Sequence, residues 1–202
     1  MNLLGRAAQV YVPKPVRKLL LTRLLEGTAA AFTTAAPAAA SADIAARSAG
    51  LGGPPSVRPV SLPRGLSAEQ TLHAFRDFTA QVVVEPAAAP AVSQRLFDLA
   101  YGHGKGLRRA LGVASASDAM AAARVLYGIL GIDFTGDARG EITVSRCFFS
   151  RAYTPEVCKL MSSLDAGLLA GLADGGKLVF SQRITEGSAC CRARLVGAGA
   201  TP

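Results

Sequence analysis

The residues best suited to chemistry are the four cysteines, which all lie in the last third of the chain. They are Cys147, Cys158, Cys190 and Cys191, and the first 146 residues contain none. The segment that holds them reads as strand, helix, strand, turn and strand. This order can bring Cys147, Cys158 and one of the last two cysteines to a common point. Convergent thiols can hold a metal or supply a reactive thiolate.

The position of each cysteine within its element narrows the candidate site. Cys158 falls in the first turn of a helix predicted to begin at Thr154, where the helix dipole stabilises a thiolate. Asp165 follows seven residues later and lies on the same helical face. Cys191 alternates with the two arginines of the last strand and is the inward cysteine, whereas Cys190 is the spare one. Cys147 lies near the end of the strand that precedes the helix of Cys158.

Less specific interpretations stay open for these residues. Free cysteines are often small core hydrophobes, and the spacing lacks CxxC or any common zinc-ribbon pattern. Asp165 stands in an apolar stretch, where it either pairs with a basic residue or belongs to the site. His103 lies near Lys105 and Arg108, which indicates either an anion-binding or catalytic corner or a solvated basic patch.

Charge is distributed unevenly over the 202 residues. Residues 1–66 carry eight basic and two acidic side chains, which give +6 of the net charge of +8 for the whole chain. No nucleic-acid-binding signature accompanies this charge. The stretch from Val16 to Leu25 mixes leucines with basic residues, which is compatible with weak peripheral membrane contact or with ordinary helix packing. The sequence shows no membrane-spanning run and no convincing secretory signal, so the expected location is cytoplasmic, with reduced cysteines.

Three regions are predicted along the chain. Residues 1–33 form a basic, leucine-rich N-terminal helix, residues 34–66 an Ala/Pro/Gly-rich linker, and residues 67–202 a domain with a cysteine-centred site. Within the domain the pattern predicts helices beginning at Ser67, over 91–111, from the cap Ser117 to Leu130, and over 154–173. It predicts strands over 132–136, 141–149, 177–185 and 190–196.

The segment from Phe97 to Leu195 resembles the L-2-amino-thiazoline-4-carboxylic acid hydrolase-like proteins, distant relatives of the four-vinyl-reductase ligand-binding domains. Three short motifs carry the resemblance. They are Arg146-Cys147 after a strand, Cys158 and Asp165 within CKLMSSLD, and Gly187 followed four residues later by Cys191.

The resemblance implies an α+β fold, with helices packed on a small antiparallel sheet and, here, an N-terminal helical extension. It also implies hydrolytic opening of a cyclic C=N substrate, a thiazoline carboxylate, to an S-carbamoyl cysteine. Cys147, Cys158 and Cys191 would hold zinc or, alternatively, an iron–sulfur cluster, and Asp165 would transfer protons. A metal-free route would use Cys158 as the nucleophile. The rival hypothesis is a non-enzymatic metal-binding domain that binds or senses a small ligand.

Overall fold

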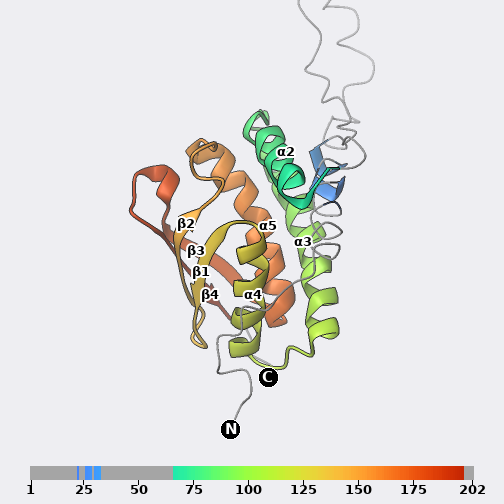
Figure 1. Cartoon of the computed structure of the whole chain (residues 1–202), viewed down its shortest axis with the longest axis vertical. Coiled ribbons are helices and arrows are strands. Elements are labelled where there is room, and N and C mark those ends of the chain that lie inside the picture. Colours follow the sequence, from blue (N-terminus) through green and yellow to red (C-terminus); the bar gives the residue numbers. More distant parts are fainter. Residues whose placement is uncertain (1–21, 23–25, 29, 33–65, 198–202) are drawn as a thin grey trace, which may run out of the picture.

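The computed structural model describes residues 66–197, together with Thr22, 26–28 and 30–32 (Figure 1). The described residues between 22 and 32 are helical, as predicted. The rest of the N-terminal helix, almost all of the predicted linker and the membrane-contact prediction lie outside the described residues. No helix in the described ranges is long and apolar enough to cross a membrane.

The described domain has an α+β fold. Its elements, in chain order, are α2 (Ala68–Ala80), α3 (Ala89–Leu111), α4 (Ala116–Ile129), β1 (Ile132–Gly136), β2 (Glu141–Cys147), α5 (Pro155–Ala173), β3 (Lys177–Gln182), the short 3-10 helix η2 (Ile184–Glu186) and β4 (Cys191–Val196). This arrangement confirms the predicted fold class of helices on a small antiparallel sheet.

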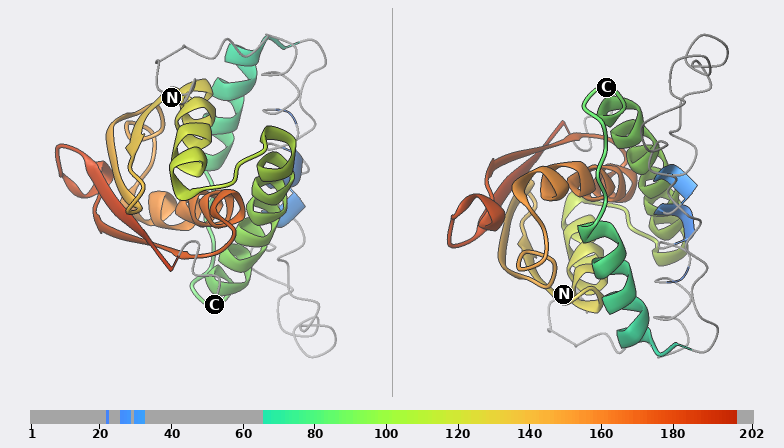
Figure 2. Two further views of the ribbon diagram at one scale, coloured as in Figure 1. Left: turned by 90° about the horizontal axis from the view of Figure 1, so that it is seen from below. Right: turned by 90° about the horizontal axis from the view of Figure 1, so that it is seen from above.

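The four strands form one antiparallel sheet in the order β1-β2-β4-β3. The last strand alternates as its sequence predicts: Ala193 and Leu195 are buried, whereas Arg192 and Arg194 are exposed. The helices all lie on one side of this sheet, with α5 between the sheet and α3 (Figures 1 and 2). The core lies between the inner sheet face and the helices, and α2, α3, α4 and α5 all contribute buried side chains to it.

Local capping explains where two of the helices begin. Ser67 caps α2 in a reciprocal capping box with Gln70, as predicted. Thr154 caps α5 by accepting a hydrogen bond from the Val157 amide, and Pro155 occupies the first helical position. The cap fixes the start of α5 and thereby the place of Cys158 in its first turns.

The predicted start of α4 is wrong by two residues. Ser115, not Ser117, is the N-cap, and its side chain forms a capping box with Asp118. Both serines stand before the same apolar run, but only Ser115 has an acidic residue three positions later, whose carboxylate returns to the cap amide.

The segment between β3 and β4 also differs from the prediction. The strand expected to reach Thr185 ends at Gln182, and η2 follows, closed by Gly187 with a φ of 90°. This change of direction puts Thr185 on the wall of the cavity described below. A run of strand-forming residues does not reveal such a turn, because no capping side chain marks its start.

Candidate functional site

A cavity of about 130 Å³ lies inside the domain, at the place where its elements converge. Its wall includes side chains from α2, α3, α4 and α5, from β1, β2 and β4, from η2, and from the loop between β2 and α5. Most of the lining is apolar, and a few polar groups interrupt it. A cavity of this size suits a ligand of a single small ring.

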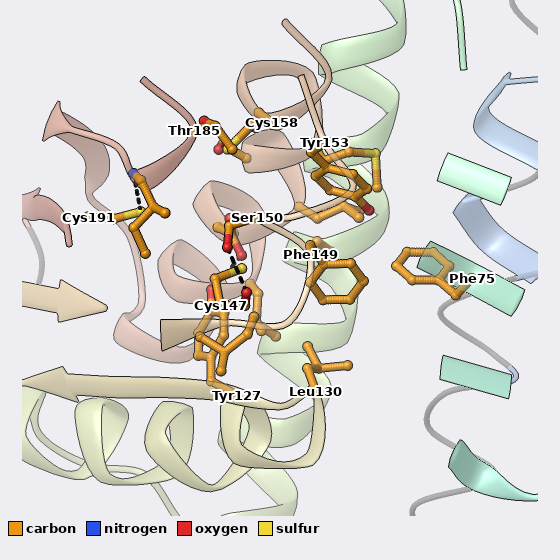
Figure 3. Close-up of a pocket in the computed structure, with 18 of the residues that line it drawn as sticks. Phe75, Tyr127, Leu130, Cys147, Phe149, Ser150, Tyr153, Cys158, Thr185 and Cys191 are labelled. Atoms are coloured by element: carbon orange, nitrogen blue, oxygen red, sulfur yellow. Dashed lines mark hydrogen bonds between the residues drawn. The ribbon is translucent and has the colours of Figure 1, made fainter. Parts of the chain in front are cut away.

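Three of the four cysteines line this cavity, as the element order predicts. They are Cys147 at the end of β2, Cys158 on α5 and Cys191 at the start of β4 (Figure 3). Cys190 does not line it, and its sulfur instead accepts a hydrogen bond from the Gln182 amide at 3.2 Å. The sequence therefore brings the three predicted thiols to one cavity.

The three thiols have different surroundings. Burial raises the pKa of the Cys147 thiol to about 11. Burial also raises the pKa of Cys191, although the Ile184 amide donates to its sulfur at 3.3 Å. Both are therefore protonated at neutral pH. Cys158 is the thiol that contacts a cation, because Arg183 Nη1 lies 3.9 Å from its sulfur.

The arrangement of these thiols does not fit the predicted metal. Within the described residues, no group of three or more His, Cys, Asp or Glu side chains is placed to hold an ion. Zinc and an iron–sulfur cluster stay predictions, and the chemistry proposed below uses neither.

Asp165 is the acidic group of the cavity. Its partner is the Tyr127 hydroxyl, which donates to Oδ1 at 2.8 Å, and it forms no salt bridge with the described basic residues. Burial raises the pKa of Asp165 to about 6, while the Tyr127 hydrogen bond and the charge of Arg183 act in the opposite direction. The side chain keeps some accessible surface, as expected for a group that borders a cavity. A carboxyl with this pKa exchanges protons near neutral pH.

Tyr127 was not a candidate from its sequence, because it ends an alanine-rich helical stretch without any motif. It is buried, stacks on Phe134 with ring centroids 4.8 Å apart, and has a pKa raised well above the ordinary value by burial and by the charge of Asp165. Its proton therefore stays on the hydroxyl, which makes Tyr127 a permanent donor to Asp165. Only the fold, which brings α4 beside α5, reveals this pair.

A polar end of the cavity forms around Cys158. Arg183 Nη1 donates to Ser162 Oγ at 2.6 Å, and Ser162 Oγ donates to the Cys158 carbonyl at 2.7 Å. Thr185 lies beside Cys158 in Figure 3, and its buried Oγ1 has no hydrogen-bond partner among the described residues. A buried hydroxyl without a partner is rare in folded proteins and needs an explanation.

The opposite end of the cavity is aromatic. Phe75 and Phe149 meet edge to face with centroids 5.9 Å apart, on the far side from Cys191 and Thr185 (Figure 3). Tyr153 packs on Phe149, and its hydroxyl is bonded to Thr79 Oγ1, so that this tyrosine presents its ring to the cavity. The cavity thus has one end for polar groups and one for apolar ones.

His103 lies on the cavity wall, apart from the basic corner predicted from its neighbours. Its Nδ1 is hydrogen-bonded to the Leu99 carbonyl at 2.8 Å, one turn earlier on α3. Arg108 points elsewhere and donates to the Leu172 carbonyl at 2.8 Å. The basic residues of α3 therefore do not gather around this histidine to form one anion site.

No protein-family model, curated protein or solved structure matches the chain.

Proposed function

We propose that this chain is a hydrolase-like protein that opens a small cyclic C=N substrate inside the cavity. The observation that carries the proposal is the buried carboxyl of Asp165, with a pKa of about 6, on the same wall as the Cys158 thiol. The resemblance to thiazoline-carboxylate hydrolase-like proteins names the substrate class, and the cavity volume suits a five-membered ring. The four free cysteines agree with a cytoplasmic location.

The chemistry begins at the C=N bond. Protonated Asp165 gives its proton to the ring nitrogen, which makes the adjacent carbon electrophilic. The Cys158 sulfur bonds to that carbon, and the thiol proton passes to Asp165. The ring C–N bond then breaks, and the nitrogen leaves as an amine with a proton relayed from the exocyclic amino group.

Hydrolysis of the sulfur-bound carbon completes the sequence. Water adds to this carbon, the C–S bond to Cys158 breaks, and the thiol recovers its proton. In sum, one water is consumed and one ring C–N bond is cleaved. Tyr127 keeps the Asp165 carboxyl oriented throughout, because its own proton is held by burial.

Turnover of 2-amino-thiazoline-4-carboxylate tests this proposal. We expect Cys158→Ala to abolish turnover and Asp165→Asn to lower kcat by about 10²- to 10⁴-fold, the usual contribution of a positioned general acid. Cys190→Ala is the matched control, because Cys190 neighbours a lining cysteine but lies off the cavity, and it should keep full activity.

A chelator arm separates the two routes. Full turnover after dialysis against a chelator supports the metal-free route, whereas loss that zinc restores indicates that the predicted metal site forms. A wild-type chain that binds the thiazoline without converting it contradicts the hydrolase proposal and supports the non-enzymatic ligand-binding hypothesis. Turnover that survives Cys158→Ala removes this thiol from the mechanism.

A further inference from the structure

We propose that Arg183 and Thr185 form a carboxylate-binding subsite at the Cys158 end of the cavity. That the anion is the substrate's own carboxylate rests on the hydrolase proposed above. The existence of the subsite rests on the surroundings of these two residues alone.

Arg183 lies between the inner cavity and a groove on the surface. On one side its Nη1 contacts Cys158 and Ser162, both of which line the inner cavity. On the other side it borders a surface groove of about 420 Å³ that also includes Lys159 and Lys177. A guanidinium in this place is reached from solvent and adjoins the buried cavity at the same time.

Arg183 forms no salt bridge with a carboxylate in the described part of the chain, although its charge lowers the pKa of Asp165. The neighbouring Glu186 pairs with Lys159 at 2.9 Å. The Arg183 guanidinium packs on the Phe180 ring, 3.8 Å from its centroid. This packing holds the planar group in place, and its only hydrogen-bond acceptors among the described residues are Ser162 Oγ and the Cys158 sulfur. A half-buried guanidinium that forms no direct salt bridge favours an anion beside it.

Thr185 supplies the second group. Its Oγ1 is buried and has no hydrogen-bond partner among the described residues, and the residue lines the same cavity as Cys158, its neighbour in Figure 3. Because a carboxylate has two acceptor oxygens, it can bond to the guanidinium through one and to a hydroxyl through the other. The positive charge of the guanidinium favours a carboxylate over a neutral amide of the same shape.

Alkylation of Cys158 by iodoacetate and by iodoacetamide measures this selection directly. The two reagents have nearly the same shape and differ in charge. Each reacts by attack of the thiolate on carbon, with loss of iodide carrying the bonding electrons. The readout is the ratio of the two rate constants at Cys158, followed by mass spectrometry of the peptide that contains it. Any change in thiol ionisation affects both reagents equally and cancels in the ratio.

We expect Arg183→Met to lower the iodoacetate-to-iodoacetamide ratio by about 10- to 100-fold, the effect of losing a charge-assisted hydrogen bond. The ratio for Arg183→Lys should lie between those of wild type and Arg183→Met, because lysine keeps the positive charge but lacks the planar pair of donors of the guanidinium. Thr185→Val, which keeps the volume, should lower the ratio several-fold. Arg192→Met, which removes an exposed arginine from the outer sheet face, should leave it unchanged.

The same ratio in wild type and Arg183→Met overturns the subsite, as does an equal fall in Arg192→Met. If Arg183→Met fails to fold, Thr185→Val and Arg183→Lys carry the same decision. No thiazoline enters this assay, so its outcome is separate from that of the hydrolase. A preserved ratio effect without thiazoline turnover leaves the subsite and removes the hydrolase.

Discussion

The two halves of α5 differ in what they place against the rest of the domain. Its N-terminal part, as far as Asp165, presents Cys158, Ser162 and Asp165 to the cavity. Its C-terminal half presents Gly167 and Gly171 to α3, where backbone meets backbone. Polar side chains of α5 border the cavity, whereas glycines occur where α5 touches α3 most closely. Close packing of one half thus holds the reactive half in position.

The tightness of the glycine contact follows from where a Cβ atom would lie. A Cβ on Gly171 would stand 2.5 Å from the Tyr101 carbonyl oxygen, and one on Gly104 would stand 2.5 Å from that of Leu168. Both neighbours are backbone atoms, which cannot rotate away. The two helices can approach this closely only because glycine occurs on both sides.

Replacement of Gly171 should disrupt the contact between α5 and α3 and give the largest loss of stability. We expect Gly171→Ala to lower the free energy of unfolding by about 2–3 kcal/mol, because α3 and α5 must move apart to admit the methyl group. The measurement is urea denaturation. Gly106→Ala is the matched control: Gly106 lies on α3 with open space around it, so alanine should raise the stability by up to about 1 kcal/mol through helix propensity. Equal stabilities for the two variants would contradict the close contact.

The sequence predicts one half of α5 better than the other. The cap at Thr154 and the spacing of Cys158 and Asp165 are local, so the sequence alone predicts α5 and its polar face. The glycines of YGHGKG do not kink α3, which is continuous, and Gly104 makes the close approach to α5. Which of the three alternating glycines makes this approach depends on α5, which lies far along the chain.

The cavity itself was predictable only in part. The order of strands and helices brings the cysteines together, which the sequence shows. Tyr127 and Thr185 join the wall through a helix pairing and a 3-10 turn, neither of which leaves a motif. No sequence pattern marks Arg183, which follows a strand. Only the folded structure shows that it lies between the groove and the cavity.

The difference in pH dependence between wild type and Asp165→Asn should report on the reactive half of α5. The pKa of Asp165 is raised to about 6 in the folded chain, from 3.8. Between these values the folded state binds more protons than the unfolded state, so the contribution of Asp165 to stability falls as the pH rises from about 4 to about 6. Asp165→Asn lacks this contribution. The stability of the variant relative to wild type should therefore increase across that window and level off above it.

Urea unfolding from pH 4 to pH 7.5 measures this difference. Asp98→Asn is the control, because Asp98 is an exposed carboxylate on the outer side of α3, and its curve should run parallel to that of wild type. A parallel curve for Asp165→Asn as well would mean that the carboxyl is not held in a buried environment.

Removal of the Tyr127 hydroxyl should give the smallest effect and sharpen the account of the reactive half. Tyr127→Phe keeps the ring that stacks on Phe134 and loses the donor to Asp165. This hydrogen bond opposes the rise in the pKa of Asp165, so its loss should move the carboxyl titration to higher pH, measured by the carbon-13 shift of the carboxyl. The stability at neutral pH should fall by about 0.5–1.5 kcal/mol, the net value of one hydrogen bond. Tyr153→Phe, whose hydroxyl is bonded to Thr79, should leave the titration in place. If the Asp165 titration moves downward in Tyr127→Phe, the tyrosine does not act as a donor to the ionised carboxylate, and the oriented acid of the proposed mechanism is lost.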